Sequence, residues 1–183
     1  MGEIMKNKLK DKLIKLLKEV ECVQFGDFTL ASGKKSNYYV NIKKATTNPK
    51  ILKTVAQLIN IYIEEDKKNP NLKIAGVELG SVSIATAVSL ETEKDLIIIR
   101  KKAKDYGTKS KIEGTLNNGD TVIMVEDVTT TGGSVIKAIQ EVRENGGIVD
   151  KVFVIVDRNE GAKENLKEIG VELIALVNVE ELK

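Results

Sequence analysis

The segment Thr121–Ser134 reads TVIMVEDVTTTGGS, and its pattern decides the fold. The apolar run Thr121–Val125 is typical of a strand that is buried on both faces of a sheet. The acids Glu126 and Asp127 follow this strand, and a turn rich in hydroxyls and glycine comes next. From Gly133 to Glu144 the apolar residues recur at helical spacing, and two glycines then predict the helix end. The segment therefore predicts a strand–turn–helix unit of an α/β protein.

The same alternation continues on both sides of this unit and extends it into a sheet. Short β-branched runs predict strands, and amphipathic stretches between them predict helices. The predicted strands are Ile74–Leu79, Leu96–Ile99, Thr121–Val125, Val152–Val156 and Glu172–Leu176, and the predicted helices between them are Val82–Glu91, Gly133–Glu144 and Gly161–Ile169. We therefore expect an open, mainly parallel twisted sheet with flanking helices.

The N-terminal part has a different pattern. Lys6–Glu21 predicts an amphipathic helix, Gly26–Ile42 predicts a loop or hairpin, and Pro49–Glu65 predicts a second helix. We expect one domain over residues 1–183, with an N-terminal segment of about 1–45 and a core of about 46–183. Within the core, Arg100–Gly119 has no firm period and is too long for an ordinary connection, so it predicts a functional loop.

Composition excludes several classes of chemistry. The 183 residues are 42% hydrophobic and carry a net charge of +2, a near balance that argues against a dedicated nucleic-acid binder. Histidine is absent, which excludes Ser-His-Asp machinery and His-ligated zinc, and the single cysteine excludes an internal disulfide. No targeting segment or membrane-spanning apolar run is evident, so we expect a cytoplasmic protein without a membrane partner.

The turn after the Thr121–Val125 strand predicts a phosphate site. Ligands of open α/β sheets bind beyond the carboxyl ends of the strands, and a glycine-bearing turn into a helix offers free N–H groups to a phosphate. A ribose 5-phosphate fits both parts, because its hydroxyls can donate to Glu126 and Asp127 while its phosphate enters the turn. The pattern is neither a Walker A loop nor a dinucleotide fingerprint. The alternative is an ordinary strand–turn–helix unit with solvated acids.

These residues carry a family resemblance. Val125–Ser134 resembles the signature of type I phosphoribosyltransferases, which bind 5-phosphoribosyl 1-diphosphate (PRPP). Three further segments resemble the orotate-specific branch of that family. They are the base-covering hood segment Phe28–Tyr39, the catalytic loop Arg100–Gly107 with Ile112–Gly114, and the base-recognition segment Asp157–Gly161. The matches lie in order and span nearly the whole chain.

The resemblance implies a reaction and a set of site residues. The reaction is orotate plus PRPP giving orotidine 5'-monophosphate and diphosphate, with Mg²⁺ held mainly by the substrate diphosphate and water rather than by protein ligands. The implied catalytic residues are Arg100, Lys101, Lys104 and Asp127. The implied PRPP-binding residues are Arg100, Lys101, Lys104, Tyr106, Glu126, Asp127, Val128, Thr129, Thr130, Thr131, Gly132, Gly133 and Ser134. Thr130 and Arg158 are implied to bind orotate, and the alternative for Arg158 is a structural ion pair with Asp157 or Glu160.

The resemblance also implies a homodimer. A mobile loop of about 100–114 would reach the neighbouring subunit's site, with Lys101 acting in trans. Three departures from the family pattern bear on the site: Ala31 stands where a lysine is common, Glu78–Ser83 lacks a lysine, and Tyr106 replaces a histidine. Two other functions stay open. One is a purine or xanthine phosphoribosyltransferase; the other is a PRPP-binding regulator, which should carry a nucleic-acid-binding element.

Overall fold

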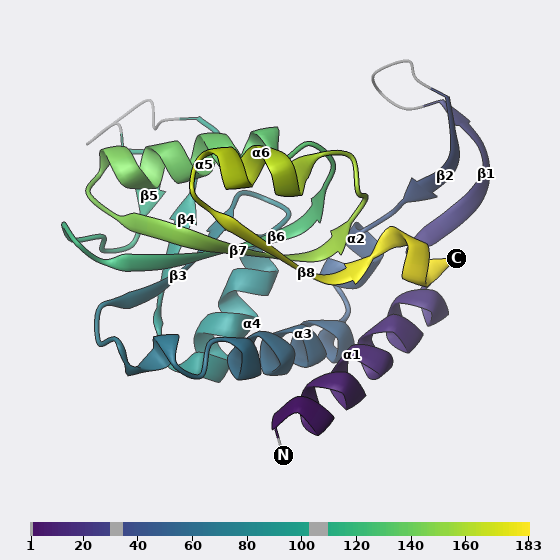
Figure 1. Cartoon of the computed structure of the whole chain (residues 1–183), viewed down its shortest axis with the longest axis horizontal. Helices are drawn as coiled ribbons and strands as arrows, with labels where there is room; N and C mark the ends of the chain where they lie inside the picture. The colour runs from purple at the N-terminus through teal and green to yellow at the C-terminus, as the bar shows by residue number, and fades with distance from the viewer. Residues whose placement is uncertain (1, 30–34, 103–109) are drawn as a thin grey trace.

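The fold is built on a six-stranded sheet. A computed structural model of the chain describes residues 2–29, 35–102 and 110–183, and the sheet order is β5-β4-β3-β6-β7-β8 (Figure 1). The strands are β3 (Leu72–Val77), β4 (Asp95–Ile99), β5 (Ile112–Glu113), β6 (Thr121–Thr129), β7 (Ile148–Asp157) and β8 (Glu172–Asn178). Only the short β5 pairs antiparallel with its neighbour, and the other pairs are parallel. The prediction of an open, mainly parallel α/β sheet is confirmed.

Helices cover both faces of the sheet and give the protein two apolar cores. The helices α5 (Gly133–Glu144) and α6 (Ala162–Glu168) lie on one face, while α1 (Gly2–Glu19), α3 (Pro49–Tyr62) and α4 (Val82–Thr92) lie on the other (Figure 1). Successive strand residues alternate between the cores, because side chains of a strand point to opposite faces. Ile123 packs in the core beside α3 and α4, whereas the next residue, Met124, packs in the core beside α5.

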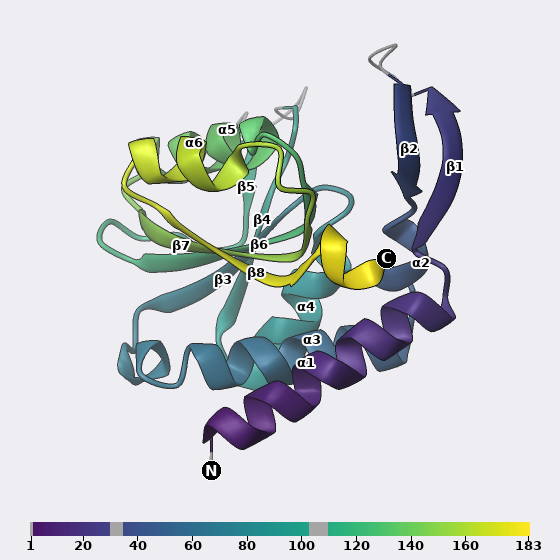
Figure 2. The ribbon, with the colours of Figure 1, turned by 45° about the vertical axis from the view of Figure 1, so that its right-hand side comes forward.

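The predicted loop or hairpin is an antiparallel hairpin of β1 (Val23–Thr29) and β2 (Lys35–Val40). It stands apart from the main sheet, and the four-residue helix α2 (Lys43–Thr46) lies between it and α3 (Figure 2). The preceding helix α1 buries Leu13 and Leu17 against the core, which anchors the hairpin to the rest of the chain. The residues between β1 and β2 lie outside the described ranges.

Three boundaries differ from the predictions for physical reasons. β6 runs four residues past Val125, because Glu126–Thr129 pair in register with the end of β7. The two acids therefore lie within the strand and not after it. Two residues of the segment Arg100–Gly119 form β5, since they pair with the end of β4. α1 begins at Gly2 rather than Lys6, and its first turn carries the exposed side chains of Ile4 and Met5. The short 3₁₀ turns Asp66–Lys68 and Val179–Leu182 had no sequence prediction.

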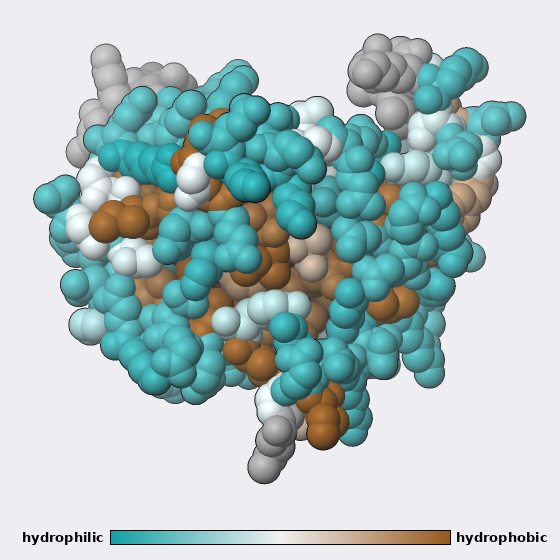
Figure 3. All heavy atoms as spheres, in the orientation of Figure 1, coloured by the Kyte–Doolittle hydropathy of each residue, from teal (hydrophilic) through white to brown (hydrophobic). Residues whose placement is uncertain are grey.

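The surface is mostly hydrophilic on the face seen in Figure 3, and apolar atoms gather in a band where Figure 1 places β7 and β8. β8 ends the sheet at this side, so no further described strand pairs with its outer edge. Among the described helices, none is both long and apolar enough to cross a membrane.

Candidate active site

The turn between β6 and α5 forms the first part of the site. A cavity of about 140 Å³ is lined by Glu126 and by every residue of Val128–Val135. Gly132 has a φ of +78°, a left-handed conformation that glycine adopts without steric cost, and α5 starts directly after it. The first N–H groups of a helix have no intrahelical acceptor, so they are free to bind an anion. The seven predicted residues Val128–Ser134 therefore all line one cavity, which is large enough for an anion.

The two acids of β6 have different surroundings. Glu126 is 9% exposed, and its carboxylate accepts hydrogen bonds from the Ser81 hydroxyl and, at 3.1 Å, from the Asp127 N–H. Burial, with the adjacent Asp127 carboxylate, raises the pKa of Glu126 to about 7. Asp127 is half-buried and accepts the Val128 N–H at 2.7 Å. Both acids line a second cavity. Glu126 is buried and hydrogen-bonded to Ser81, so Asp127 is the more accessible of the two carboxylates.

The second cavity, also of about 140 Å³, lies between β6 and the loop after β3. It is lined by Glu78, Gly80, Lys101 and Asp127 among others, and it shares Ser134 with the first cavity. The Glu78 carboxylate accepts the Lys101 N–H at 2.7 Å, and the Glu78 N–H donates to the Ile99 carbonyl at 2.9 Å. Glu78 thus fixes the backbone of Lys101 beside Asp127. Sequence reasoning missed this role, because the predicted strand Ile74–Leu79 included Glu78, whereas β3 ends at Val77 and leaves Glu78 in the loop.

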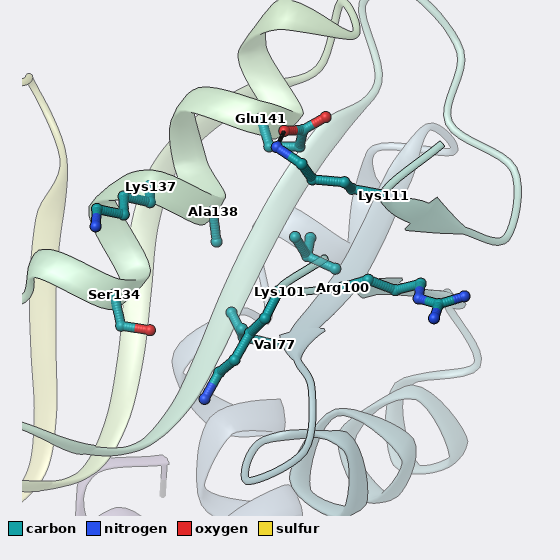
Figure 4. A pocket seen from close by; sticks show the side chains of 9 residues that line it. Val77, Arg100, Lys101, Lys111, Ser134, Lys137, Ala138 and Glu141 are labelled. Atoms are coloured by element: carbon teal, nitrogen blue, oxygen red, sulfur yellow. Dashed lines mark hydrogen bonds and ion pairs between the residues drawn. The ribbon is translucent and has the colours of Figure 1, made fainter. Parts of the chain in front are cut away.

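Arg100 lies beside this cavity without lining it. Its side chain points away from that of Lys101 (Figure 4), with Nη1 at 3.3 Å from Glu113 Oε1 and Nε at 4.0 Å from Glu78 Oε2. It lines a larger cavity of about 440 Å³ together with Lys101, Ser134 and α5 residues. The structure therefore brings Lys101 and Asp127 together but not Arg100. The predicted residues Lys104 and Tyr106 lie outside the described residues, as does Ala31.

Arg158, which the sequence predicts to bind orotate, lies beside the turn after β6. Its backbone N–H donates to the Thr129 carbonyl at 3.0 Å, and its side chain is only 12% exposed. The guanidinium Nε donates to the Tyr38 hydroxyl at 3.3 Å, and Nη2 lies 2.9 Å from Glu160 Oε1. The ion pair with Glu160 that the sequence left as an alternative is therefore present. Asp157 instead accepts the Asn159 N–H at 3.0 Å.

Three hydrogen bonds join the base-recognition segment and the following helix α6 to the end of β6 and the turn after it. The carbonyls of Thr129, Thr130 and Thr131 accept from Arg158, Ala162 and Asn165, at distances of 3.0, 3.1 and 2.8 Å. The predicted orotate-binding residues Thr130 and Arg158 consequently lie on directly bonded segments. The hairpin also approaches Arg158, because the Arg158 guanidinium carbon lies 5.0 Å from the ring centre of Tyr38.

Comparisons with known proteins agree with this geometry. Residues 41–179 match the family model of the phosphoribosyl transferase domain. The orotate phosphoribosyltransferase of Methanococcus maripaludis is 72% identical over 174 residues, which cover 95% of this chain and 94% of that protein. The chain belongs to the orotate phosphoribosyltransferase family. Its relative in Methanocaldococcus jannaschii is 68% identical, with 95% of this chain and 97% of that protein covered.

Solved structures of orotate phosphoribosyltransferases have the same fold. The enzyme of Aeropyrum pernix superposes with a TM-score of 0.81 at 33% identity, covering 93% of this chain and 95% of that chain. The Mycobacterium tuberculosis enzyme in complex with PRPP superposes with a TM-score of 0.78 at 27% identity, covering 95% of this chain and 98% of that chain. The type I phosphoribosyltransferase fold expected from the sequence is therefore confirmed.

Proposed function

We propose that this enzyme transfers the 5-phosphoribosyl group of PRPP to orotate, giving orotidine 5'-monophosphate and diphosphate in the synthesis of UMP. One observation carries the proposal: the segment that holds Arg158 is hydrogen-bonded to the turn that offers a phosphate site. The planar guanidinium suits a base that carries a carboxylate, because it can donate paired hydrogen bonds to it. A purine offers no such carboxylate, which makes Arg158 the feature that favours orotate.

The reaction needs positioning and charge rather than a protein nucleophile. A ring nitrogen of orotate forms a bond to the anomeric carbon of the ribose and gives up its proton to solvent, while the bond from that carbon to the diphosphate oxygen breaks. Positive charge develops on the sugar and negative charge on the leaving group. Asp127 is placed to accept hydrogen bonds from the ribose hydroxyls, and Lys101 to stabilise the departing diphosphate. This division of roles works without histidine, which the chain lacks.

Mg²⁺ is part of the proposal, and the donor set fits a metal that arrives with the substrate. Among the described residues, no group of three or more His, Cys, Asp or Glu side chains could hold a metal ion. Asp127 is an accessible carboxylate of the second cavity, and Mg²⁺ in such sites is commonly held by substrate phosphates, water and one or two carboxylates. When bound, the ion neutralises charge on the diphosphate. The chain's own contribution is to hold the ribose at Asp127 and the phosphate at the turn.

The proposal includes a cytoplasmic homodimer with shared active sites. Two exposed apolar side chains support an interface: Leu79, beside the site in the loop after β3, is 83% exposed, and Leu90, in the last turn of α4 and away from the site, is 76% exposed. The partner's loop would then approach the cavity that Asp127 lines, with Lys101 acting in trans. The described position of Lys101 in the cavity of its own chain needs no partner. Sharing of the sites therefore needs a direct test.

The activity is tested by measuring diphosphate release from PRPP with four bases: orotate, uracil, adenine and hypoxanthine. We expect release with orotate to exceed release with uracil by at least about a hundredfold in kcat/KM, because uracil lacks the carboxylate that Arg158 binds. Preferential release with adenine or hypoxanthine would instead establish the purine alternative. Absence of release with every base, despite measurable PRPP binding, would favour a PRPP-binding regulator.

A further inference from the structure

The base-recognition arginine is already paired with a carboxylate when no substrate is bound. We propose that Glu160 is an anion-excluding residue, whose carboxylate occupies the guanidinium of Arg158 until the carboxylate of orotate displaces it. The inference rests on the proposed function, since it takes Arg158 as the group that binds the orotate carboxylate. It assigns Glu160 a role in determining which anions enter the base site.

The geometry of the pair makes Glu160 the member that can leave. Nη2 of Arg158 lies 2.9 Å from Glu160 Oε1, but the Arg158 side chain is 12% exposed and that of Glu160 is 43% exposed. Arg158 is held by the Tyr38 hydroxyl on Nε and by the Tyr38 ring beside the guanidinium. Glu160 lies in the connection between β7 and α6, so its side chain can rotate into solvent without breaking a strand or helix hydrogen bond.

The charges around Arg158 assign this role to Glu160 and not to its neighbours. Within the described part of the chain, Glu160 makes the one ion pair of Arg158. Asp157 is buried and accepts the Asn159 N–H, and burial raises the pKa of its carboxyl. The Asp157 carboxylate is thus used within the turn, by its hydrogen bond from Asn159. The Glu160 carboxylate instead contacts the Arg158 guanidinium, the group proposed to bind orotate.

A tethered carboxylate lowers the affinity of the site for every competing anion by the same factor. Glu160 lies two residues from Arg158, so its effective concentration at the guanidinium is high. An anion that offers only a negative charge gains little by replacing one carboxylate with another. Orotate also presents ring carbonyls and a planar ring, so it retains enough affinity to displace Glu160. The pair therefore keeps small anions, and misplaced phosphates of PRPP, out of the base site.

The test uses Glu160→Gln, which keeps the size of the side chain and removes its charge. With PRPP saturating, so that the phosphate turn is filled, the KM for orotate should fall about three- to fivefold, the upper part of the range expected for losing one partly exposed ion pair. The inhibition constant of formate, competitive with orotate, should fall by the same factor. The KM for PRPP and the inhibition constant of uncharged uracil should stay within about twofold. Glu168→Gln, on an exposed α6 position, is the matched control and should change none of these constants.

Two results would overturn the inference. If Glu160→Gln raises the KM for orotate, Glu160 positions Arg158 instead of competing for it. If the variant leaves the orotate and formate constants unchanged, the ion pair has no influence on the site. Both readings require a wild-type protein that releases diphosphate with orotate. A wild-type protein that does not would refute the proposed function, and this inference with it.

Discussion

At the scale of single residues, the burial of Glu126 has a measurable consequence for stability. Burial beside Asp127 raises the pKa of Glu126 to about 7, above the ordinary range of a free carboxyl near 4.3. The folded state therefore favours the neutral form. The stability that this form contributes is fully present below the unfolded pKa and is lost as the pH rises through about 7. Between pH 5 and pH 8 the wild type should lose about 2 kcal/mol that Glu126→Gln retains.

Denaturant unfolding of the wild type and Glu126→Gln at several pH values measures this difference. Glutamine can still accept a hydrogen bond from the buried Ser81 hydroxyl, so the variant should fold. Glu168→Gln, which alters an exposed carboxyl, is the control and should follow the wild-type pH profile. Parallel profiles for the wild type and Glu126→Gln would show that Glu126 is ionised in the folded protein throughout this range.

Arg158 should determine the affinity for orotate far more than that for PRPP. Removing a buried, charge-assisted pair of hydrogen bonds costs about 1.5–3 kcal/mol, so Arg158→Ala should raise the KM for orotate at least about tenfold. Arg158→Lys should restore little, because an ammonium cannot donate the paired bonds of a planar guanidinium. Steady-state kinetics with each substrate varied in turn provides the measurement. Equal increases in both KM values would refute the assignment of Arg158 to the base.

The sequence predicted candidate site residues but not the side chains that they contact. Arg158 and Glu160 are two positions apart, so their ion pair could be considered in advance. The bond between Arg158 and Tyr38 joins residues 120 positions apart, and no local pattern signals it. The Ser81–Glu126 bond likewise joins the start of α4 to β6, and only the fold shows that Glu126 is buried there. Residue types therefore indicated the kind of chemistry, but the tertiary contacts were needed to show which side chains pair with each other.

At the scale of secondary-structure elements, the loop after β3 approaches β6 so closely that Gly80 has no room for a side chain. A methyl group on Gly80 would collide with the Asp127 carboxylate. Because that carboxylate is at the end of a side chain, it can rotate away and leave the fold intact. Gly80→Ala should therefore lower kcat/KM for PRPP at least about tenfold, a loss typical of misplaced substrate-positioning groups.

Kinetics and thermal unfolding of Gly80→Ala together distinguish a loss of PRPP use from a loss of stability. We expect the melting temperature to change by only a few degrees, since the altered contact involves the end of a half-buried side chain that can rotate away. Asp127→Asn is the comparison variant, and its defect in PRPP use should resemble that of Gly80→Ala. A large drop in melting temperature with normal kcat/KM would mean that the close approach serves packing alone.

Elements whose signals are local agree best with their predictions. α5 spans Gly133–Glu144 as predicted, because its glycine boundaries and apolar period lie within the helix itself. The extension of β6 to Thr129 depends on pairing with β7, and β5 exists only because it pairs with β4. Such pairings join segments that are distant in the sequence, so hydrophobic periodicity could not predict them. The same holds for the hairpin, where the pattern could not decide between a loop and two strands.

At the scale of the whole molecule, the proposal has two parts: the chain forms a homodimer, and Lys101 of one chain acts in the active site of the other. One chain places Lys101 and Asp127 around the same cavity, and Glu78 holds the Lys101 backbone there. The exposed side chain of Leu79, next to the cavity-lining residues Glu78 and Gly80, nevertheless favours a partner close to this site. Sedimentation at micromolar concentration should therefore give the mass of two chains, and a single chain mass would refute the dimer.

Mixing two inactive variants, Lys101→Ala and Asp127→Asn, decides between shared and separate sites. If Lys101 acts in trans, each mixed dimer has one site with both residues intact, because Asp127 comes from one chain and Lys101 from the other. Random exchange at equal amounts makes about half of the dimers mixed, so about a quarter of the wild-type activity should return. If Lys101 acts in its own chain's cavity, every site in the mixture lacks one residue and no activity returns. Each variant mixed with itself is the control, and recovery above both controls is the result that shared sites require.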